Sequence, residues 1–332
     1  MPLLLLWMIG CGWPIQVGIF ASATMTPTPW PSPTAIPPTP EPPVGSEQNP
    51  LVLALPPSAR PQGDVLNAGN TLTSILKKQT GYEFVSVIPP NEFELVEGFA
   101  SGDADIASLS PFGYLLANAQ GTAEAAFARE QDGGIFYGAE FIAPGELDFL
   151  SFFDPIQQAN LAEADVALAQ FANKKPCWTD EFSPSGYVVP LGILRQAGVT
   201  TREPAFLASH PAVVRALYAG GICDFGATYV DAMLYPGLED ELPDVNKRVE
   251  VIWRIPEIIP YETLVFSRRL PVEMRRLLTR TFVDLMGTTE GKSAMQTLYG
   301  FSAMQVVNDG RYAEFSAAVR ASGLNLQQLV ER

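Results

Sequence analysis

The fold of this chain is decided by one segment, Ser183-Pro184-Ser185-Gly186-Tyr187-Val188-Val189-Pro190. It follows a short apolar stretch that holds Cys177, and it opens a second apolar stretch that runs to Gly198. This order predicts a strand, a tight turn and a helix that begins near Ser183. Because the first N–H groups of a helix lack partners within it, two hydroxyls and a glycine here form a candidate anion-binding site. An ordinary helix cap is the alternative, since serine is a preferred capping residue.

Polar residues also follow the next two expected strands. Ser209-His210-Pro211 comes after one apolar stretch, and Thr228-Tyr229-Val230-Asp231 ends the next. The carboxyl ends of parallel strands meet at one edge of a sheet, where such sheets bind ligands. Taken singly, His210, Tyr229 and Asp231 are explained by helix capping or core packing. Their convergence with the first segment predicts a binding site.

Strands and helices are expected to alternate in two βαβαβ units, because short apolar stretches alternate with stretches of helical periodicity. The first unit comprises residues 51–55, 66–79, 82–88, 92–99 and 105–109, and the second comprises residues 176–179, a helix ending at Gly198, and residues 205–208, 212–218 and 224–228. Apolar stretches at residues 136–143, and at residues 249–253 followed by 263–266, are expected to connect the units. Residues 271–332 have helical periodicity and are expected to pack on the first unit.

The sequence therefore predicts an α/β fold of two lobes with two hinge crossings and a ligand cleft between them. Residues 51–140 and 263–332 are expected to form lobe 1, and residues 141–262 to form lobe 2.

The N-terminal residues have the composition of a targeting segment followed by a spacer. Residues 1–23 are mostly apolar, and Met8-Ile9-Gly10-Cys11 is similar to the lipidation motif of bacterial lipoproteins. Cys11 is thus the candidate lipidation site; an unmodified thiol or an uncleaved anchor are the alternatives. Residues 24–50 are expected to be an extended linker, since nine of the seventeen residues from 27 to 43 are proline.

Charge and residue counts exclude several classes of function. With 21 basic and 36 acidic side chains the net charge is 21 − 36 = −15, so a basic face for nucleic acid is not expected. One histidine and three cysteines are too few for a histidine-rich or multi-cysteine metal site, and no metal or cofactor is expected.

The motifs together resemble a known family, the substrate-binding proteins of phosphate, phosphite and phosphonate ABC importers. The resemblance covers nearly all of residues 51–310 and is most specific in the Ser-x-Ser-Gly-aromatic-x-Val-Pro segment. It implies a type II periplasmic-binding-protein fold that closes on a tetrahedral oxyanion. The ligand-binding residues that it implies are Phe93, Ser110, Ser183, Ser185, Gly186, Tyr187, His210, Tyr229, Asp231 and Glu262.

The resemblance also implies individual roles. Ser183 and Ser185 would bind the oxygens of the anion together with nearby backbone amides, and His210 would add a donor. Asp231 and Glu262 would accept hydrogen bonds from protonated oxygens or from an amino group. These acids should reject sulfate, which has no proton at neutral pH. The family pattern is broken where Pro184 replaces a hydroxyl residue, where Phe93 lacks a phenol hydroxyl and where Leu109 replaces a polar aromatic, so the oxyanion within the class stays open.

The resemblance further implies a monomer outside the cytoplasm of a bacterial cell, anchored to the membrane at its N-terminus and partnered by an ABC permease and its ATPase. Two other functions remain open. The first is a serine-dependent hydrolase with Ser183 or Ser185 as nucleophile and His210 with Asp231 as its relay, although a Gly-x-Ser-x-Gly motif is missing. The second is a sensory lipoprotein of the same fold that takes no part in transport.

A disulfide bond is expected between Cys177 and Cys223. Each cysteine lies near the start of a strand, and the usual strand order of such a unit places these two strands side by side. Two cysteines in an exported domain favour pairing, while two buried apolar thiols are the alternative.

Overall fold

The computed structural model describes residues 12, 18, 41–57 and 63–331. The chain divides after Glu41, and Pro42–Arg332 forms one compact unit. The expected targeting segment with Cys11, and most of the expected linker, lie outside the described residues. Within the described ranges, no helix combines the length and the apolar composition that crossing a bilayer requires.

The first sheet has six strands in the order β13-β4-β12-β3-β1-β2. Strand β1 pairs in parallel with β2 and β3, and the remaining neighbours are antiparallel. Leu51, Leu53 and Ile106 are completely buried, as expected for strands covered on both faces. The strands are β1 (Leu51–Ala54), β2 (Phe84–Val87), β3 (Ile106–Leu109), β4 (Ala123–Arg129), β12 (Thr263–Ser267) and β13 (Met304–Val306).

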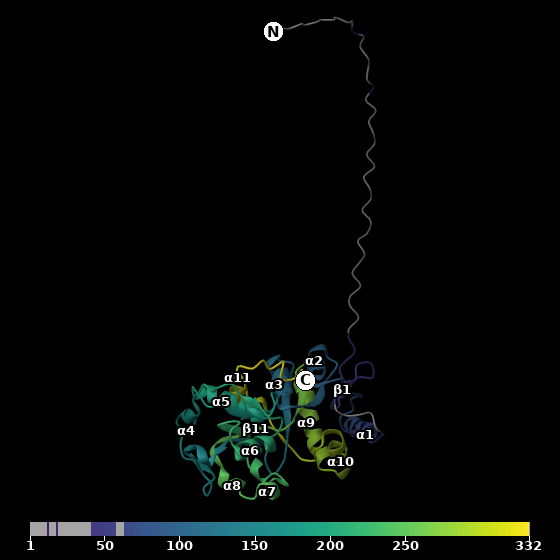
Figure 1. Cartoon of the computed structure of the whole chain (residues 1–332). Helices are drawn as coiled ribbons and strands as arrows, with labels where there is room; N and C mark the ends of the chain where they lie inside the picture. The colour runs from purple at the N-terminus through teal and green to yellow at the C-terminus, as the bar shows by residue number, and fades with distance from the viewer. Residues whose placement is uncertain (1–11, 13–17, 19–40, 58–62, 332) are drawn as a thin grey trace. The chain divides into compact units, whose positions relative to one another are not determined.

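Helices cover both faces of this sheet. Three of them, α1, α9 and α10, lie side by side (Figure 1) and bury Leu72, Leu278 and Phe282 against β1 and β12 in one cluster. Helix α2 begins at the capping residue Asn91 and ends at Gly102, whose φ of 92° favours glycine. The helices are α1 (Gly63–Thr80), α2 (Glu92–Ser101), α3 (Pro111–Ala119), α9 (Val272–Met286) and α10 (Thr289–Tyr299).

The second sheet has five strands in the order β11-β5-β10-β8-β9. Its core is aromatic: the rings of Phe171 and Phe225 stack with their centroids 4.0 Å apart, and Trp178 meets Phe225 edge-on at 5.9 Å. The strands are β5 (Phe136–Pro144), β8 (Pro176–Trp178), β9 (Ala205–Phe206), β10 (Phe225–Tyr229) and β11 (Val249–Pro260). A small hairpin of β6 (Phe153–Asp154) and β7 (Ala159–Asn160) adjoins β11.

The helices of this half are shorter. They are α4 (Ala164–Leu168), α5 (Val189–Gln196), α6 (His210–Ala219), α7 (Leu238–Glu241) and α8 (Val245–Arg248), with single turns η1 (Gly145–Leu147), η2 (Ala169–Phe171), η3 (Pro184–Val188) and η4 (Ala232–Leu234). After β13, η5 (Asp309–Tyr312) leads into the last helix, α11 (Ala313–Ala321).

Two crossings join the sheets, one from β4 to β5 and one from β11 to β12. They are bonded to each other, since Arg129 N–H donates to the carbonyl of Glu262 at 2.9 Å and Tyr261 N–H donates to that of Ile135 at 3.3 Å. The first crossing is a hairpin turn in which Asp132 and Gly133 both have positive φ, 53° and 84°. The expected boundary at residue 140 is therefore wrong: all of β5 belongs to the second sheet, because the turn at 131–134 ends the first.

The expectation that all of residues 271–332 pack on the first unit is wrong for the last helix. Helices α9 and α10 pack on the first sheet as expected, whereas α11 packs against α5 beside the second (Figure 1). Gly192 on α5 allows this approach because the backbone of Ala318 occupies the place of a side chain at 192. Phe315 of α11 also stacks on Phe112 of α3, with centroids 6.0 Å apart. Helix α11 therefore contacts both halves of the molecule.

The end of the expected linker also belongs to the folded unit. Val44 packs against the cluster under α1, and the carbonyl of Gly45 accepts a hydrogen bond from Glu83 N–H at 2.9 Å. The side chain of Asn49 donates to the carbonyl of Pro42 at 3.0 Å. Residues 42–50 are therefore folded, and an extended spacer can reach only to about residue 41.

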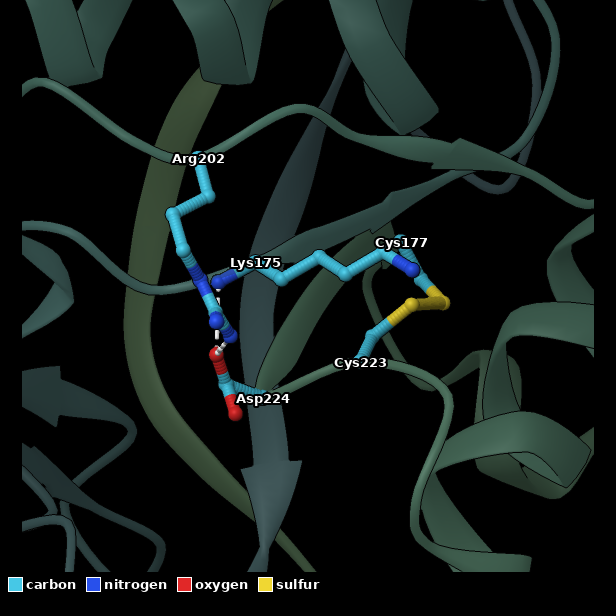
Figure 2. The surroundings of a disulfide bond; sticks show 5 residues. All are labelled: Lys175, Cys177, Arg202, Cys223 and Asp224. Carbon is cyan, nitrogen blue, oxygen red and sulfur yellow. Dashed lines mark hydrogen bonds and ion pairs between the residues drawn. A yellow bond between two sulfur atoms is a disulfide. The ribbon is translucent and has the colours of Figure 1, made fainter.

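Cys177 and Cys223 form a disulfide bond with their Cα atoms 5.6 Å apart, as the strand order predicts (Figure 2). Beside it, Asp224 accepts hydrogen bonds from Lys175 N–H at 2.6 Å and from the guanidinium of Arg202 at 2.7 Å. The disulfide links the amino-terminal ends of β8 and β10, which are parallel neighbours in the sheet, so it lies at the edge opposite their carboxyl ends.

Removing this disulfide should lower the free energy of unfolding by about 2–4 kcal/mol, because the bond closes a loop of sequence separation 46 in the unfolded chain. Urea unfolding of the wild type with and without reductant measures the loss. A double variant with Cys177→Ser and Cys223→Ser is the control, and reductant should not change its stability. Equal stability of the reduced and unreduced wild type would contradict the prediction.

Candidate functional site

A cavity of about 550 Å³ lies where β10 ends, next to the two crossings. Three residues that the sequence analysis selected line it together: Ser185, His210 and Tyr229. The other lining residues are Gln131, Asp132, Tyr137, Gly138, Val230 and Tyr261.

The segment that follows β8 begins with a π-helical turn, η3, which places Ser185 at this cavity. The hydroxyl of Ser183 caps the turn by accepting Gly186 N–H at 3.0 Å, and Val188 N–H donates to the carbonyl of Ser183 at 3.0 Å. Both serines are buried. Such wide turns are frequent at functional sites, and the alternative of an ordinary cap holds here for Ser183 but not for Ser185.

Gly186 is needed at this turn because the backbone passes directly over Thr179. A Cβ at position 186 would lie 2.8 Å from Thr179 Cβ and closer still to its hydroxyl. In the described part of the structure, the buried hydroxyls of Thr179 and Thr228 have no hydrogen-bond partner. Thr179 directly follows β8, and Thr228 is the residue before Tyr229 at the end of β10.

Tyr137 on β5 makes the opposite wall of the cavity. Its pKa is raised to about 12, mainly by burial, and a hydrogen bond with the Ser185 hydroxyl opposes that rise. Its ring stacks on Tyr261 with the centroids 5.1 Å apart, and the guanidinium of Arg129 lies 5.9 Å from the centre of the Tyr261 ring. The two hinge crossings therefore supply an aromatic wall that faces the serine turn.

His210 begins α6 and is held in one tautomer. Its Nδ1 accepts a hydrogen bond from Tyr229 N–H at 3.3 Å, which leaves the proton on Nε2. Its pKa is lowered to about 4, mainly by burial, while Asp180 opposes the shift. Near neutral pH the ring is therefore an uncharged donor at the cavity.

Asp231 does not join the cavity, although its neighbours Tyr229 and Val230 line it. Its backbone adopts a left-handed φ of 62°, and its carboxylate pairs with Arg254 at 2.7 Å. Arg254 also binds the completely buried Glu140 at 3.1 Å, and Glu140 accepts Asp231 N–H at 3.2 Å. Burial, opposed by Arg254, raises the pKa of Glu140 to about 7. Asp231 therefore lies outside this cavity, because an arginine from another strand holds its carboxylate elsewhere, and its role in ligand binding stays a prediction.

Ser110 and Glu262 line a second cavity, of about 670 Å³, on the first lobe. Its polar lining also includes Asn91, Glu92 and Ser108. Glu262 pairs with Arg129 at 2.9 Å. Tyr261 lines the first cavity and its neighbour Glu262 lines the second, so the second hinge crossing contributes one residue to each.

Phe93 and Tyr187 line neither cavity. Phe93 is half-buried against the large core, and Tyr187 packs between Trp178 and Phe206 at centroid distances of 5.9 and 5.0 Å. The sequence analysis also missed Tyr137, Gly138 and Tyr261 at the first cavity. Only the Asp132-Gly133 turn gave a signal, since Asp-Gly between two apolar stretches is typical of a tight hairpin.

The serine relay is not assembled among the described residues. Neither Ser183 nor Ser185 is hydrogen-bonded to His210, whose Nδ1 is occupied by Tyr229 N–H. The carboxylate of Asp231 pairs with Arg254 and not with the histidine. A general base within hydrogen-bonding reach of the nucleophile is what such chemistry requires.

Replacing Gly186 with alanine should weaken ligand binding roughly tenfold, a loss of about 1.4 kcal/mol, because the added methyl group forces the turn off Thr179. Isothermal titration calorimetry with the ligand of the wild type measures the change. Gly69→Ala in α1 is the control, since its nearest side-chain atoms would be at 3.4 Å. Equal affinity of the Gly186→Ala variant and the wild type would refute this role of the turn.

His210 should titrate near pH 4 in the folded protein, which NMR can follow without assignment because the chain has one histidine. The unfolded chain binds the proton near pH 6.5. The wild type should therefore lose stability relative to His210→Gln as the pH falls from 6.5 towards 4, by up to about 3 kcal/mol. Urea unfolding of both proteins across this range is the second measurement. An imidazole signal that titrates near pH 6.5 would show the prediction to be wrong.

Comparison with known proteins identifies the family of the chain. The family model described as "ABC transporter, phosphonate, periplasmic substrate-binding protein" matches residues 57–312. The phosphate-import protein PhnD of Mycolicibacterium smegmatis is 28% identical over 210 residues, which are 59% of this chain and only 60% of that relative's length.

Solved structures show the same fold at low sequence identity. XAC2383 from Xanthomonas citri is 14% identical and covers 82% of this chain and 98% of its own, with TM-scores of 0.56 for the structure bound to ATP and 0.57 for the one bound to chloride. The chain has the type II periplasmic-binding-protein fold and belongs to the family of periplasmic substrate-binding proteins of phosphonate ABC transporters.

Proposed function

We propose that this protein captures a phosphorus oxyanion in the cavity between the serine turn and the hinge, and delivers it to an ABC importer. The observation that carries the proposal is the convergence of Ser185, His210 and Tyr137 on one cavity at the carboxyl ends of the strands. Hydroxyls and an imidazole N–H are the donors that bind a compact oxyanion, and charge-assisted hydrogen bonds to it are strong.

The protein's net negative charge does not prevent this binding, because donors next to the ligand set the local potential. His210 is an uncharged donor, and the start of the helix beyond Ser183 contributes backbone N–H groups and its dipole. Because the carboxylate of Asp231 pairs with Arg254 outside the cavity, it does not repel an anion inside the cavity. This arrangement favours phosphate, phosphite or a phosphonate with a small substituent.

Membership of the family implies a small ligand, partner permease and ATPase subunits and a location outside the cytoplasm. We further propose that the protein acts as a monomer, that residues 1–23 target it for export, and that lipidation of Cys11 anchors it to the membrane. The proline-rich residues up to about 41 would then hold the folded unit away from the membrane surface. The lobes would rotate about the crossings at residues 130–135 and 261–262.

Thermal-shift and calorimetric measurements with phosphate, phosphite, methylphosphonate, aminoethylphosphonate and sulfate test the proposal. The wild type should bind at least one phosphorus oxyanion, and Ser185→Ala should weaken that binding by about 1.5–3 kcal/mol through the loss of a charge-assisted hydrogen bond. The exposed Ser101 on α2 supplies a control in Ser101→Ala. If no phosphorus oxyanion binds the wild type, the proposed function is wrong; unchanged affinity in Ser185→Ala would remove only that residue from the site.

A further inference from the structure

Two long hydrogen bonds hold the end of β10 where it lines the first cavity. Tyr229 N–H donates to Nδ1 of His210 at 3.3 Å, and Val230 N–H donates to the carbonyl of Gly138 at 3.4 Å. All four residues line that cavity. Tyr229 is the last residue of β10 in register with β5, so the chain directly beyond it depends on other contacts. The bond that fixes the tautomer of His210 is therefore a weak one at the end of a strand.

Asp231, two residues further on, is held at both its backbone and its side chain. Its N–H donates to Oε1 of Glu140 at 3.2 Å, and its carboxylate pairs with Nη2 of Arg254 at 2.7 Å. Nε of Arg254 donates to Oε2 of Glu140 at 3.1 Å, so the three residues form a closed ring of contacts. Asp231 has a left-handed φ of 62°, a conformation that is costly for a residue with a Cβ unless other contacts hold it. This ring of contacts supplies what the end of β10 lacks.

The second sheet places the ring on one row of three neighbouring strands. Thr228 of β10, Glu140 of β5 and Arg254 of β11 are in register with each other. Arg254 is itself anchored, since it also donates to Oε1 of Gln158 and lies 4.2 Å from the centre of the Phe153 ring. Glu140 is completely buried, and a buried carboxylate is costly even when it is paired. Within the described residues, Asp231 N–H is the one backbone group that donates to this carboxylate.

We propose that Glu140 is a positioning residue for ligand binding, which holds Asp231 and, through it, the strand end whose Tyr229 N–H keeps the proton of His210 on Nε2. This inference rests on the proposed function. Glu140 does not line the cavity and acts through His210. If the strand end moves, Nδ1 loses its donor and the neutral imidazole can adopt either tautomer. An imidazole whose Nε2 lacks the proton is an acceptor at that atom, and it no longer offers an N–H there to an anion.

The test compares Glu140→Met with Glu140→Gln, because both variants remove the same negative charge. Glutamine retains an oxygen that can accept Asp231 N–H, whereas methionine has a similar length and no such oxygen. Calorimetry at pH 7 with inorganic phosphate and with methylphosphonate measures the affinities. Glu140→Met should bind these anions roughly tenfold more weakly than Glu140→Gln, since the position of one donor to the anion is lost.

The single histidine supplies a second readout that needs no ligand. The imidazole ¹⁵N signals of the wild type and of Glu140→Gln should show the proton on Nε2 at pH 7, and those of Glu140→Met should shift towards a mixture of the two tautomers. A residue that only stabilised the fold would lower the free energy of unfolding of Glu140→Met without changing these signals. Identical imidazole signals or equal anion affinities in the two variants would overturn the role of Glu140.

An independent pair of variants covers the case in which Glu140→Met does not fold. Asp231→Ala and Asp231→Gly both lack the carboxylate, but only glycine adopts a left-handed φ without strain. Asp231→Gly should therefore bind phosphate more tightly than Asp231→Ala and keep the proton of His210 on Nε2; equal behaviour of the pair would overturn the inference. A wild type that binds no phosphorus oxyanion would show the proposed function to be wrong, while the imidazole signals would still decide the role of Glu140.

Discussion

The pairing of the two hinge crossings is the constraint on which the site depends. Hydrogen bonds from Arg129 N–H to Glu262 and from Tyr261 N–H to Ile135 make the crossings one antiparallel ribbon that continues into both sheets. The ribbon fixes Tyr137 and Tyr261 against each other and against the serine turn. The aromatic wall is therefore built on the same paired ribbon that joins the two sheets.

A buried charge network explains why one side of the cavity carries few acids. Glu140 is completely buried, which is costly for a carboxylate unless it is paired and hydrogen-bonded. Arg254 compensates the charge of Glu140 and also binds the carboxylate of Asp231. Tyr229, at the end of β10, and Val230 line the cavity, whereas Asp231 does not. The polarity of the second lobe is thus set by residues outside the cavity.

Much of the fold could be predicted because local signals agreed with each other: apolar stretches, proline and glycine positions and strand order gave both βαβαβ units and the pairing of Cys177 with Cys223. The convergence of Ser185 and His210 on one cavity could be predicted because parallel strands end at one edge of the sheet. The position of Asp231 outside the cavity could not be predicted, because its direction depends on a left-handed φ and on Arg254, 23 residues away.

Helix α11 adds a mechanical consequence to this arrangement. Its Ala318 backbone lies against Gly192 of α5, the guanidinium of Arg195 donates to the carbonyl of Ser322, and Phe315 stacks on Phe112 of α3. One short helix is thus fastened to a helix of each lobe, outside the hinge. Any rotation of the lobes about the crossings would therefore have to change one of these two contacts, at Gly192 or at Phe112.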